Sequence, residues 1–298
     1  MKLGIYSNTF KRDSVEAVMD AVVSYGLDTI HFDASSVGLP SMPDEMSDEV
    51  CQRVRVAVDE RGINVVSISG TFNMIHPDVS ERERGLRQLE VLAEACGPIG
   101  TDKISLCSGT RNRDSMWRRH PDNDLPNAWD DMLVTMRAAV AIAEKHNVVL
   151  VVEPEVANVV DSAAKARRML DEIQSPYLKI VFDGANVFHT GELAQMHSIL
   201  DESIALLGDD IVLAHAKDLD KDGQAGHLAA GTGFLDYGFY LGKLRSIGFA
   251  DREDSAVVMH GLTEAQVPWC AKFVQGIINQ GQRYQHRNTN TEGRLPRE

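Results

Sequence analysis

The sequence predicts an α/β protein, a single-domain (β/α)8 TIM barrel, and two observations lead to this prediction. Eight short apolar runs rich in Val and Ile alternate with eight segments of helical periodicity. A chain of 298 residues also has the size that eight such pairs need. The competing architecture, an open doubly wound sheet, usually has fewer strands and a glycine-rich phosphate turn after the first strand. Here that turn reads Ser7-Asn8-Thr9-Phe10, so we favour the closed barrel and expect no nucleotide cofactor.

Strands and helices are expected to alternate along the whole chain. The predicted strands are residues 3–6, 29–32, 63–68, 103–107, 148–152, 178–182, 211–214 and 256–259. The predicted helices are residues 15–24, 48–61, 81–96, 128–146, 163–173, 193–207, 237–247 and 264–278. Asp161 and Ser162 are a start signal for the fifth helix, whereas Gly26, Gly62 and Gly248 follow other helices as stop signals. The barrel therefore occupies residues 1–282, and residues 283–298, polar and without an apolar period, form a C-terminal tail.

Charge and cysteine content exclude several classes of protein. Lys and Arg number 30 against 44 Asp and Glu, a net charge of −14, which disfavours nucleic acid as a partner. The four cysteines are scattered without a CxxC pair, which argues against a disulfide scaffold or a zinc ribbon. We expect no signal peptide, because the chain opens like a strand, and no membrane span, because no run of 18 residues is apolar. These features predict a cytoplasmic enzyme or binding protein.

Four successive predicted strands end on side chains that bind metals. These are Glu153, Asp183, His215 and His260. Active sites of barrels lie where the carboxyl ends of the strands meet, so the four are expected to converge there. One such residue alone is often a helix cap, a loop salt bridge or a satisfied core histidine. Four together are costly without a counter-charge and favour a divalent ion, with Mn²⁺, Co²⁺ or Zn²⁺ fitting better than Mg²⁺.

The chain resembles the xylose isomerase-like barrels, specifically the sugar phosphate isomerase/epimerase family of the D-tagatose 3-epimerase type. The resemblance covers nearly the whole chain up to about residue 280, and its most specific element is His215-Ala216-Lys217-Asp218. Other stretches that carry it are Glu153-Pro154-Glu155, Asp183-Gly184-Ala185-Asn186, Gly231-Thr232-Gly233 with Asp236, Gly70-Thr71-Phe72-Asn73, His76-Pro77-Asp78, and Trp117 through Trp129.

The resemblance implies a ligand set with one departure. Glu153, Asp183 and His215 correspond to metal ligands of the family, whose fourth ligand is usually a glutamate where this chain has His260. Family epimerases use two metal-bound glutamates, one on each face of the sugar, to remove and return a proton. Asn186 stands where many relatives have a substrate-binding histidine. Barrels of this family often pair, so a homo-oligomer is a further expectation.

A divalent ion that chelates a carbonyl and its neighbouring hydroxyl stabilises the enediolate formed by deprotonation of the adjacent carbon. The candidates for the base and the acid are Glu153, His76 and Lys217. Lys217 shares strand parity with His215, so both should point into the barrel, where a neighbouring dication would lower the pKa of the amine. A salt bridge of Lys217 with Asp218, Glu155 or Asp183 is the alternative. Schiff-base chemistry on Lys217 is less favoured.

Asn8, Arg111, Glu155 and Asn186 are the candidate substrate-binding residues. Arg111 and Arg113 follow the fourth strand and either hold an anionic group of the substrate or belong to a solvated basic loop.

The predicted function is a metal-dependent isomerase or epimerase of a sugar or keto-sugar. A lyase or dehydratase acting through the same enediolate is the alternative within the enzymes, and His260 keeps it open. An endonuclease of abasic DNA shares the fold but needs many more ligands and fits the negative charge badly. A barrel without catalysis that serves as a binding or assembly subunit is the non-enzymatic alternative.

Overall fold

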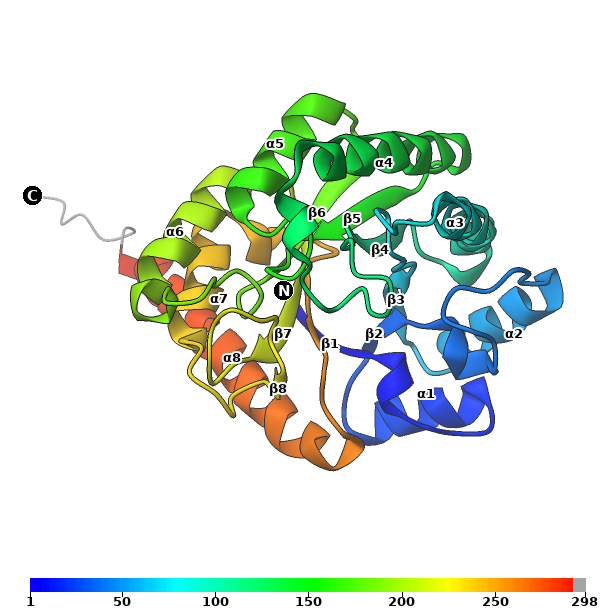
Figure 1. The fold of residues 1–298 in the computed structure, drawn as a ribbon. Coiled ribbons are helices and arrows are strands. Elements are labelled where there is room, and N and C mark those ends of the chain that lie inside the picture. Colours follow the sequence, from blue (N-terminus) through cyan, green and yellow to red (C-terminus); the bar gives the residue numbers. More distant parts are fainter. Residues whose placement is uncertain (292–298) are drawn as a thin grey trace, which may run out of the picture.

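The computed structural model describes residues 1–291, with side chains described through residue 281. Within this part, eight parallel strands close into a barrel surrounded by eight helices (Figure 1). The barrel strands are β1 (Lys2–Tyr6), β2 (Thr29–Phe32), β3 (Asn64–Ser69), β4 (Lys103–Cys107), β5 (Val149–Glu153), β6 (Leu178–Asp183), β7 (Ile211–Asp218) and β9 (Ala256–Met259). Each strand pairs with its neighbour in sequence, and β9 pairs with both β7 and β1, which closes the ring. The predicted (β/α)8 barrel is confirmed.

The helices agree closely with the prediction, apart from their ends. They are α1 (Val15–Ser24), α2 (Asp48–Asp59), α3 (Val79–Ile99), α4 (Pro126–His146), α5 (Ala163–Ile173), α6 (Met196–Leu207), α7 (Tyr237–Ser246) and α8 (Val267–Thr291). Residues predicted to open two of them form 3-10 turns before α6 and α8. Several helices begin at a side-chain cap, as at Ser14, Ser47, Asp78 and Ser162, whose oxygens accept backbone N–H groups.

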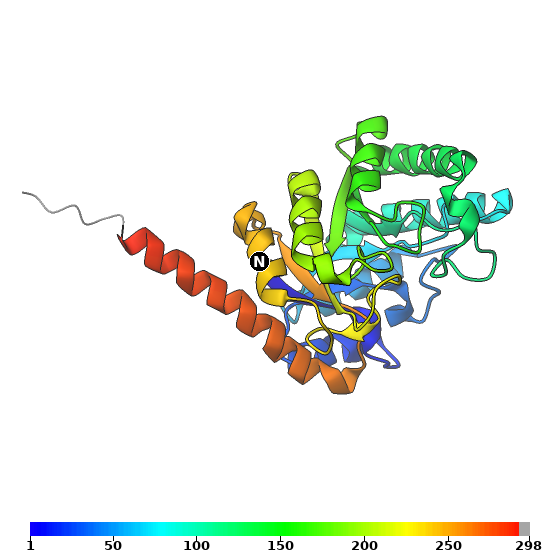
Figure 2. The same ribbon diagram turned by 60° about the vertical axis from the view of Figure 1, so that its left-hand side comes forward.

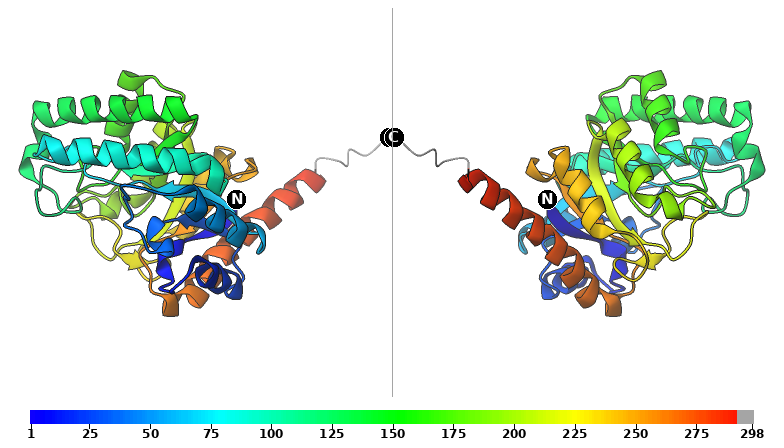
Figure 3. Two further views of the ribbon diagram at one scale, coloured as in Figure 1. Left: turned by 90° about the vertical axis from the view of Figure 1, so that its right-hand side faces the viewer. Right: turned by 90° about the vertical axis from the view of Figure 1, so that its left-hand side faces the viewer.

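The last helix is longer than the sequence pattern suggests. α8 continues to Thr291, so the first part of the segment predicted as a tail is helical, while residues 292–298 lie outside the described residues. Figures 2 and 3 show the end of α8 extending beyond the body of the barrel. None of the helices in the described part is long and apolar enough to cross a membrane.

The seventh barrel strand is also longer than predicted. It runs on to Asp218 because a short strand in the following loop, β8 (Leu228–Ala229), pairs with it in antiparallel fashion. Lys217 lies opposite Ala229, and Asp218 lies opposite Leu228. This extension keeps the His215–Asp218 element on a regular strand, so that alternate side chains point to the same side.

Apolar residues form two layers, one on each side of the barrel wall. Side chains such as Ile5, Ile30 and Phe182 pack between the strands and the helices. A smaller cluster fills the barrel interior: Tyr6, Val66, Val151, Val181, Leu213, Ala256 and Val258. Two residues after Val151, Val181 and Leu213 come Glu153, Asp183 and His215, which therefore share the inward direction. The inner apolar layer is thus the floor beneath the polar residues at the barrel mouth.

Gly85 of α3 provides a test of how the loop after β3 is packed. A Cβ at this position would overlap the buried ring of Phe72, whereas a Cβ at Gly242 of α7 would meet nothing within 4 Å. Replacing a helical glycine by alanine ordinarily stabilises a helix by about 0.5–1 kcal/mol. We expect Gly242→Ala to follow this rule and Gly85→Ala to lower the free energy of unfolding by about 1–3 kcal/mol. Urea denaturation of both variants measures the difference, and two equal, stabilising effects would contradict it.

Candidate metal centre and active site

Three of the four predicted ligands come together at the mouth of the barrel. Glu153 ends β5, Asp183 ends β6, and His215 lies opposite Asp183 on β7. One ligand atom from each residue lies within 4.8 Å of the others. Asp183 and His215 are almost completely buried, and the Glu153 side chain is 12% exposed. The three strand ends therefore present two carboxylates and one imidazole to a common point, which we call the metal group.

Glu153 is oriented by three donors that all reach the same oxygen. Its Oε1 accepts from Asn186 Nδ2 at 2.6 Å, His215 Nδ1 at 3.1 Å and Lys217 Nζ at 3.3 Å. Asn186 is itself fixed, because its Oδ1 accepts from the backbone N–H of Gly226 at 2.7 Å. No described residue donates a hydrogen bond to Glu153 Oε2. One carboxylate oxygen is thus anchored and the other is free for a ligand or a proton.

Buried atoms without partners show that the site has unused binding capacity. Asp183 Oδ2 and His215 Nε2 are buried and have no hydrogen-bond partner within the described part of the chain. Lys217 Nζ lies 3.2 Å from Asp183 Oδ2, an ion pair without hydrogen-bond geometry. Its one positive charge balances only one of the two carboxylates. The residues present therefore fit a divalent cation, both in charge and in their mixture of oxygen and nitrogen donors.

Lys217 points into the barrel, as its strand parity predicts. Burial disfavours the charged amine, but Glu153, Asp183 and Glu155 outweigh it and raise the pKa of Lys217. From the sequence we expect a lowered pKa for Lys217 beside a dication, whereas the protein's own carboxylates shift this pKa in the opposite direction. Burial also acts against ionised Glu153, yet Lys217 and His215 hold the pKa of that carboxyl well below its usual range. A protonated Lys217 is a proton donor and an ion-pair partner, and it is unsuited to Schiff-base formation.

Of the three salt bridges considered for Lys217, the one with Asp183 is present. Asp218 instead holds the loop after β7, because its two oxygens accept the backbone N–H groups of Leu219, Leu235 and Gly231 at 2.9–3.0 Å. A larger or neutral side chain at this position would lose these three charge-assisted hydrogen bonds. The last two residues of the His215–Asp218 element thus have different contacts: Lys217 pairs with the carboxylates of the site, and Asp218 binds the backbone of the following loop.

Glu155 is a buried loop residue. Its oxygens accept from the Ala157 N–H at 3.1 Å and from Asn158 Nδ2 at 2.8 Å, which shapes the turn after β5. Burial raises the pKa of Glu155 to about 7. Asn8 lies in the 3-10 turn after β1 and lines a surface cavity of about 230 Å³. Neither residue forms a hydrogen bond with the metal group among the described residues.

Two predicted site residues are engaged elsewhere. The Arg111 guanidinium donates to the carbonyls of Ile75 and Asn127 and pairs with Asp131, which Arg82 also contacts. His76 accepts the Asp78 N–H at Nδ1 and contacts the Arg113 carbonyl through Nε2 at 3.3 Å. Both side chains connect the loops after β3 and β4, and the structure does not bring either of them to the metal group.

His260 points into the barrel but stays outside the metal group. It continues the inward alternation of Ala256 and Val258, and its ring centroid lies 5.7 Å from that of His215. The ring stacks on Tyr6, with centroids 4.3 Å apart and planes 20° from parallel. Its Nδ1 is buried and has no hydrogen-bond partner within residues 1–281. The position is therefore adjacent to the group without completing it.

Sequence reasoning missed two arrangements around the site. Tyr6 also stacks on His31, at 4.1 Å and 18°. The inward parity of these residues on β1 and β2 is a signal, but it does not predict which rings touch. The second arrangement is centred on Asp161, whose side chain is 7% exposed.

The Asp161 network joins three loops at the mouth. Asp161 Oδ2 contacts Lys165 Nζ at 2.8 Å, Arg119 Nη1 at 3.2 Å and His189 Nε2 at 3.6 Å. Arg119 belongs to the loop after β4, Asp161 to the loop after β5 and His189 to the loop after β6. A single buried carboxylate therefore links the segments that follow three adjacent strands.

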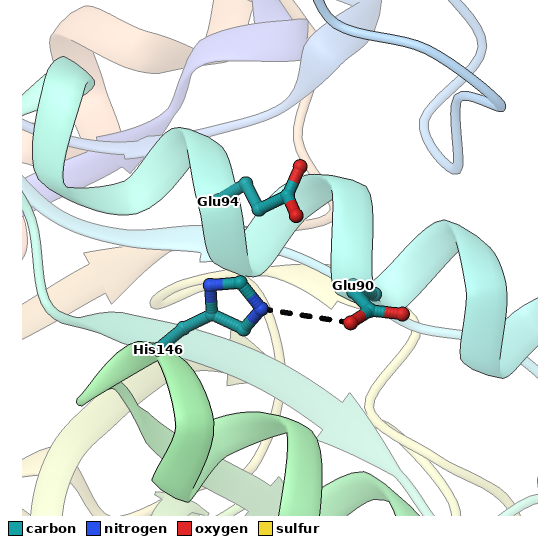
Figure 4. A group of neighbouring side chains, drawn as sticks. All are labelled: Glu90, Glu94 and His146. Carbon is teal, nitrogen blue, oxygen red and sulfur yellow. Dashed lines mark ion pairs between the residues drawn. The ribbon is translucent and has the colours of Figure 1, made fainter.

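A second cluster of possible ligands lies away from the mouth. Glu90 and Glu94 of α3 and His146 of α4 have ligand atoms within 4.8 Å of one another (Figure 4). Lys145 already pairs with Glu90 at 2.6 Å, and Glu94 is exposed. The geometry is that of an ion-pair cluster between two helices, in which the buried His146 Nε2 lies 3.7 Å from Glu90.

Comparison with known proteins agrees with this architecture. A family model described as the xylose isomerase-like TIM barrel matches residues 19–253. The structure is similar to a 3-keto-D-glucoside 4-epimerase from E. coli, with 18% identity and a TM-score of 0.70 over 93% of this chain and 99% of that one. It is also similar to a D-psicose 3-epimerase from Clostridium cellulolyticum H10, with 15% identity and a TM-score of 0.67 over 95% and 99% of the two chains.

A third similar structure has a different printed activity. It is a probable 3-DHS dehydratase from Bacillus anthracis, with 15% identity and a TM-score of 0.69 over 91% of this chain and 97% of that one. No curated protein matches the sequence. At identities this low, the similarity shows a shared fold.

The Asp161 network predicts a pH-dependent contribution to stability. The contact with the Asp161 carboxylate is the main cause that raises the pKa of His189, against the effect of burial. A raised folded-state pKa means that protonated His189 stabilises the fold below the pKa of the unfolded chain, about 6.5, and that this contribution disappears as the pH rises through the folded pKa. We expect His189→Gln to cost less than about 1 kcal/mol at pH 5.5, because the pair is partly exposed, and still less at pH 8.5. Denaturant titrations at both pH values test this, and an equal cost at both would refute it.

Proposed function

The chain belongs to the xylose isomerase-like TIM barrel family, and from this premise we propose that it is a divalent-metal-dependent isomerase or epimerase of a sugar or keto-sugar. The observation that carries the proposal is the metal group, in which Asp183 Oδ2 and His215 Nε2 are buried beside Glu153 without a hydrogen bond from any described residue. A barrel that served only as a binding or assembly subunit would have no reason to maintain buried polar atoms without hydrogen bonds at this point.

Glu153, Asp183 and His215 are the proposed metal ligands, and His260 is the proposed fourth. Mixed carboxylate and imidazole donors favour Mn²⁺, with Co²⁺, Zn²⁺ and Mg²⁺ as alternatives. His260 would have to move toward the other three to join them; its ring lies beside His215, and its Nδ1 has no hydrogen-bond partner among the described residues.

The proposed reaction removes a proton from the carbon next to a carbonyl. A bound divalent ion would stabilise the negative charge that develops on the carbonyl and hydroxyl oxygens. Glu153 is the proposed base, because Asn186, His215 and Lys217 anchor its Oε1 while Oε2 accepts no hydrogen bond from the described residues. Lys217 is the proposed proton donor, since its neighbours keep it protonated. Both groups meet at one place, as acid and base must for a proton to be moved and returned.

The proposal does not keep His76 as an acid or base, nor Arg111 as a direct ligand of the substrate. Both ring nitrogens of His76 contact backbone groups, and the Arg111 guanidinium is occupied by Asp131 and two carbonyls. We assign them to the loop framework around the substrate. Asn186 positions the base through its 2.6 Å hydrogen bond.

A lyase or dehydratase of a related keto-sugar is the second candidate. His260 is the observation that favours it, because an imidazole replaces the second carboxylate that a two-base epimerase would use. A site with one carboxylate base can form the enediolate and then lose a leaving group from the neighbouring carbon, with Lys217 as the acid.

The metal itself provides the first test of the proposal. We expect the purified protein to bind about one divalent ion per chain, as a single site of this kind does. Asp183→Ala removes a fully buried ligand and should reduce the metal content to background, whereas Asp130→Ala, at an exposed position on α4, should leave it unchanged. Elemental analysis of the three proteins after dialysis measures this. Equal metal in wild type and Asp183→Ala would rule out the assigned site.

Solvent isotope labelling tests the class of reaction. If Glu153 removes a proton from carbon, turnover of a substrate in D₂O should place deuterium next to the carbonyl. Glu153→Gln cannot accept the proton and should lower kcat by about 100- to 10,000-fold, the usual contribution of general acid–base catalysis. Mass spectrometry and proton NMR of the product detect the label. A product free of deuterium would instead indicate an internal hydride shift.

A further inference from the structure

The His260 imidazole contacts other rings but forms no side-chain hydrogen bond with a described residue. Neither of its ring nitrogens forms a hydrogen bond with a described residue, and Nδ1 is buried. Its backbone N–H makes one long contact, 3.4 Å, with the Ala216 carbonyl, and the following residue, Gly261, has a φ of 71° that begins a loop. The close, nearly parallel contact with Tyr6 is therefore the feature that determines how this imidazole lies.

Tyr6 stacks on a second histidine, His31, whose ring is restrained by hydrogen bonds at both nitrogens. His31 is fully buried, and its Nδ1 and Nε2 contact Ser67 Oγ and Ser105 Oγ, each at 2.9 Å. A hydroxyl on each side of the ring defines its plane, because both in-plane nitrogens are engaged. Tyr6 lies parallel to this plane at 4.1 Å. Three rings from β1, β2 and the end of β9 therefore form one stack whose orientation is set by serines on β3 and β4.

We infer that Tyr6 is a positioning residue, whose ring transmits the fixed plane of His31 to His260 and thereby presents the His260 imidazole to the metal group. Stacked aromatic contacts stabilise a preferred ring orientation beyond the effect of burying area. Tyr6 also lies edge-on to His215, with centroids 6.4 Å apart, and the His260 ring meets His215 edge-on at 5.7 Å. This inference rests on the proposed function, because it takes His260 to be a ligand of the proposed metal site.

The test uses two readouts on the full-length protein, neither of which needs a substrate. The first is the NMR signal of the His260 ring in ¹³C-labelled histidine, assigned among ten histidines by its loss in His260→Gln. Stacking on Tyr6 should displace this signal upfield through the ring current. The second is the affinity for Co²⁺, titrated alone into metal-free protein.

Three variants separate positioning from simple packing. Tyr6→Phe keeps the ring and should preserve both the displaced signal and the Co²⁺ affinity. Tyr6→Leu removes the ring, and we expect the signal to return toward that of an unstacked histidine and the Co²⁺ affinity to fall by about tenfold, within the range found when groups that orient a ligand are removed. Tyr6→Met places a longer and more flexible side chain in the vacated space without stacking, and it replaces Tyr6→Leu if that protein does not fold.

Each result decides the inference. An undisplaced His260 signal in the wild type overturns it, and this measurement does not depend on the folding of any variant. Unchanged Co²⁺ affinity in Tyr6→Leu or Tyr6→Met overturns it, as does a Tyr6→Phe protein that behaves like either of them. If the wild type binds no Co²⁺, the proposed function fails. The His260 signal alone then tests whether Tyr6 stacks on His260.

Discussion

The mouth of the barrel depends on the balance of charge between two buried carboxylates and one lysine. Glu153 and Asp183 end adjacent strands, and parallel pairing forces their side chains into the same small space. Two carboxylates removed from water repel each other strongly, and a buried charge is tolerated only with a counter-charge. Lys217 provides one, from the next strand, at 3.2–3.3 Å from both. Asn186 and His215 add hydrogen bonds to Glu153. One negative charge remains without a counter-charge, and it favours binding of a cation at this site.

Other buried acids and amides have a mechanical function in the same region. Asp218 holds the loop after β7 through three backbone N–H groups, and Asp161 links the loops after β4, β5 and β6. Asn186 connects the loop after β6 to Glu153. These groups sit one layer outside the metal group and restrict the motion of the segments that surround it. A site built on strand ends gains rigidity from the sheet, and here buried side chains also anchor the loops around it.

The fold and the heart of the site were predictable because both depend on local periodicity. The strand ends predicted that Glu153, Asp183, His215 and His260 converge, and the structure brings the first three together with His260 beside them. Strand parity predicted the inward direction of Lys217, which reaches Asp183. Arg111 was different, because its partner Asp131 lies twenty residues away on α4 and no local pattern connects the two. Which rings stack around Tyr6 follows from the twist and closure of the barrel, which a linear pattern does not contain.

The imidazole at position 260 changes the charge of the site, and this bears on its chemistry. Glu153, Asp183 and Lys217 together carry a charge of −1, since two carboxylates face one ammonium. With a divalent ion bound, as proposed, the sum becomes +1. The glutamate that the family usually has in place of His260 would make the sum zero. Electrostatic interactions are strongest where water is excluded, so in the proposed reaction the extra positive charge would stabilise an anion formed on the substrate more than the neutral ground state. Histidine at position 260 would thus favour formation of the proposed enediolate, but it leaves no second carboxylate to return the proton from the opposite face.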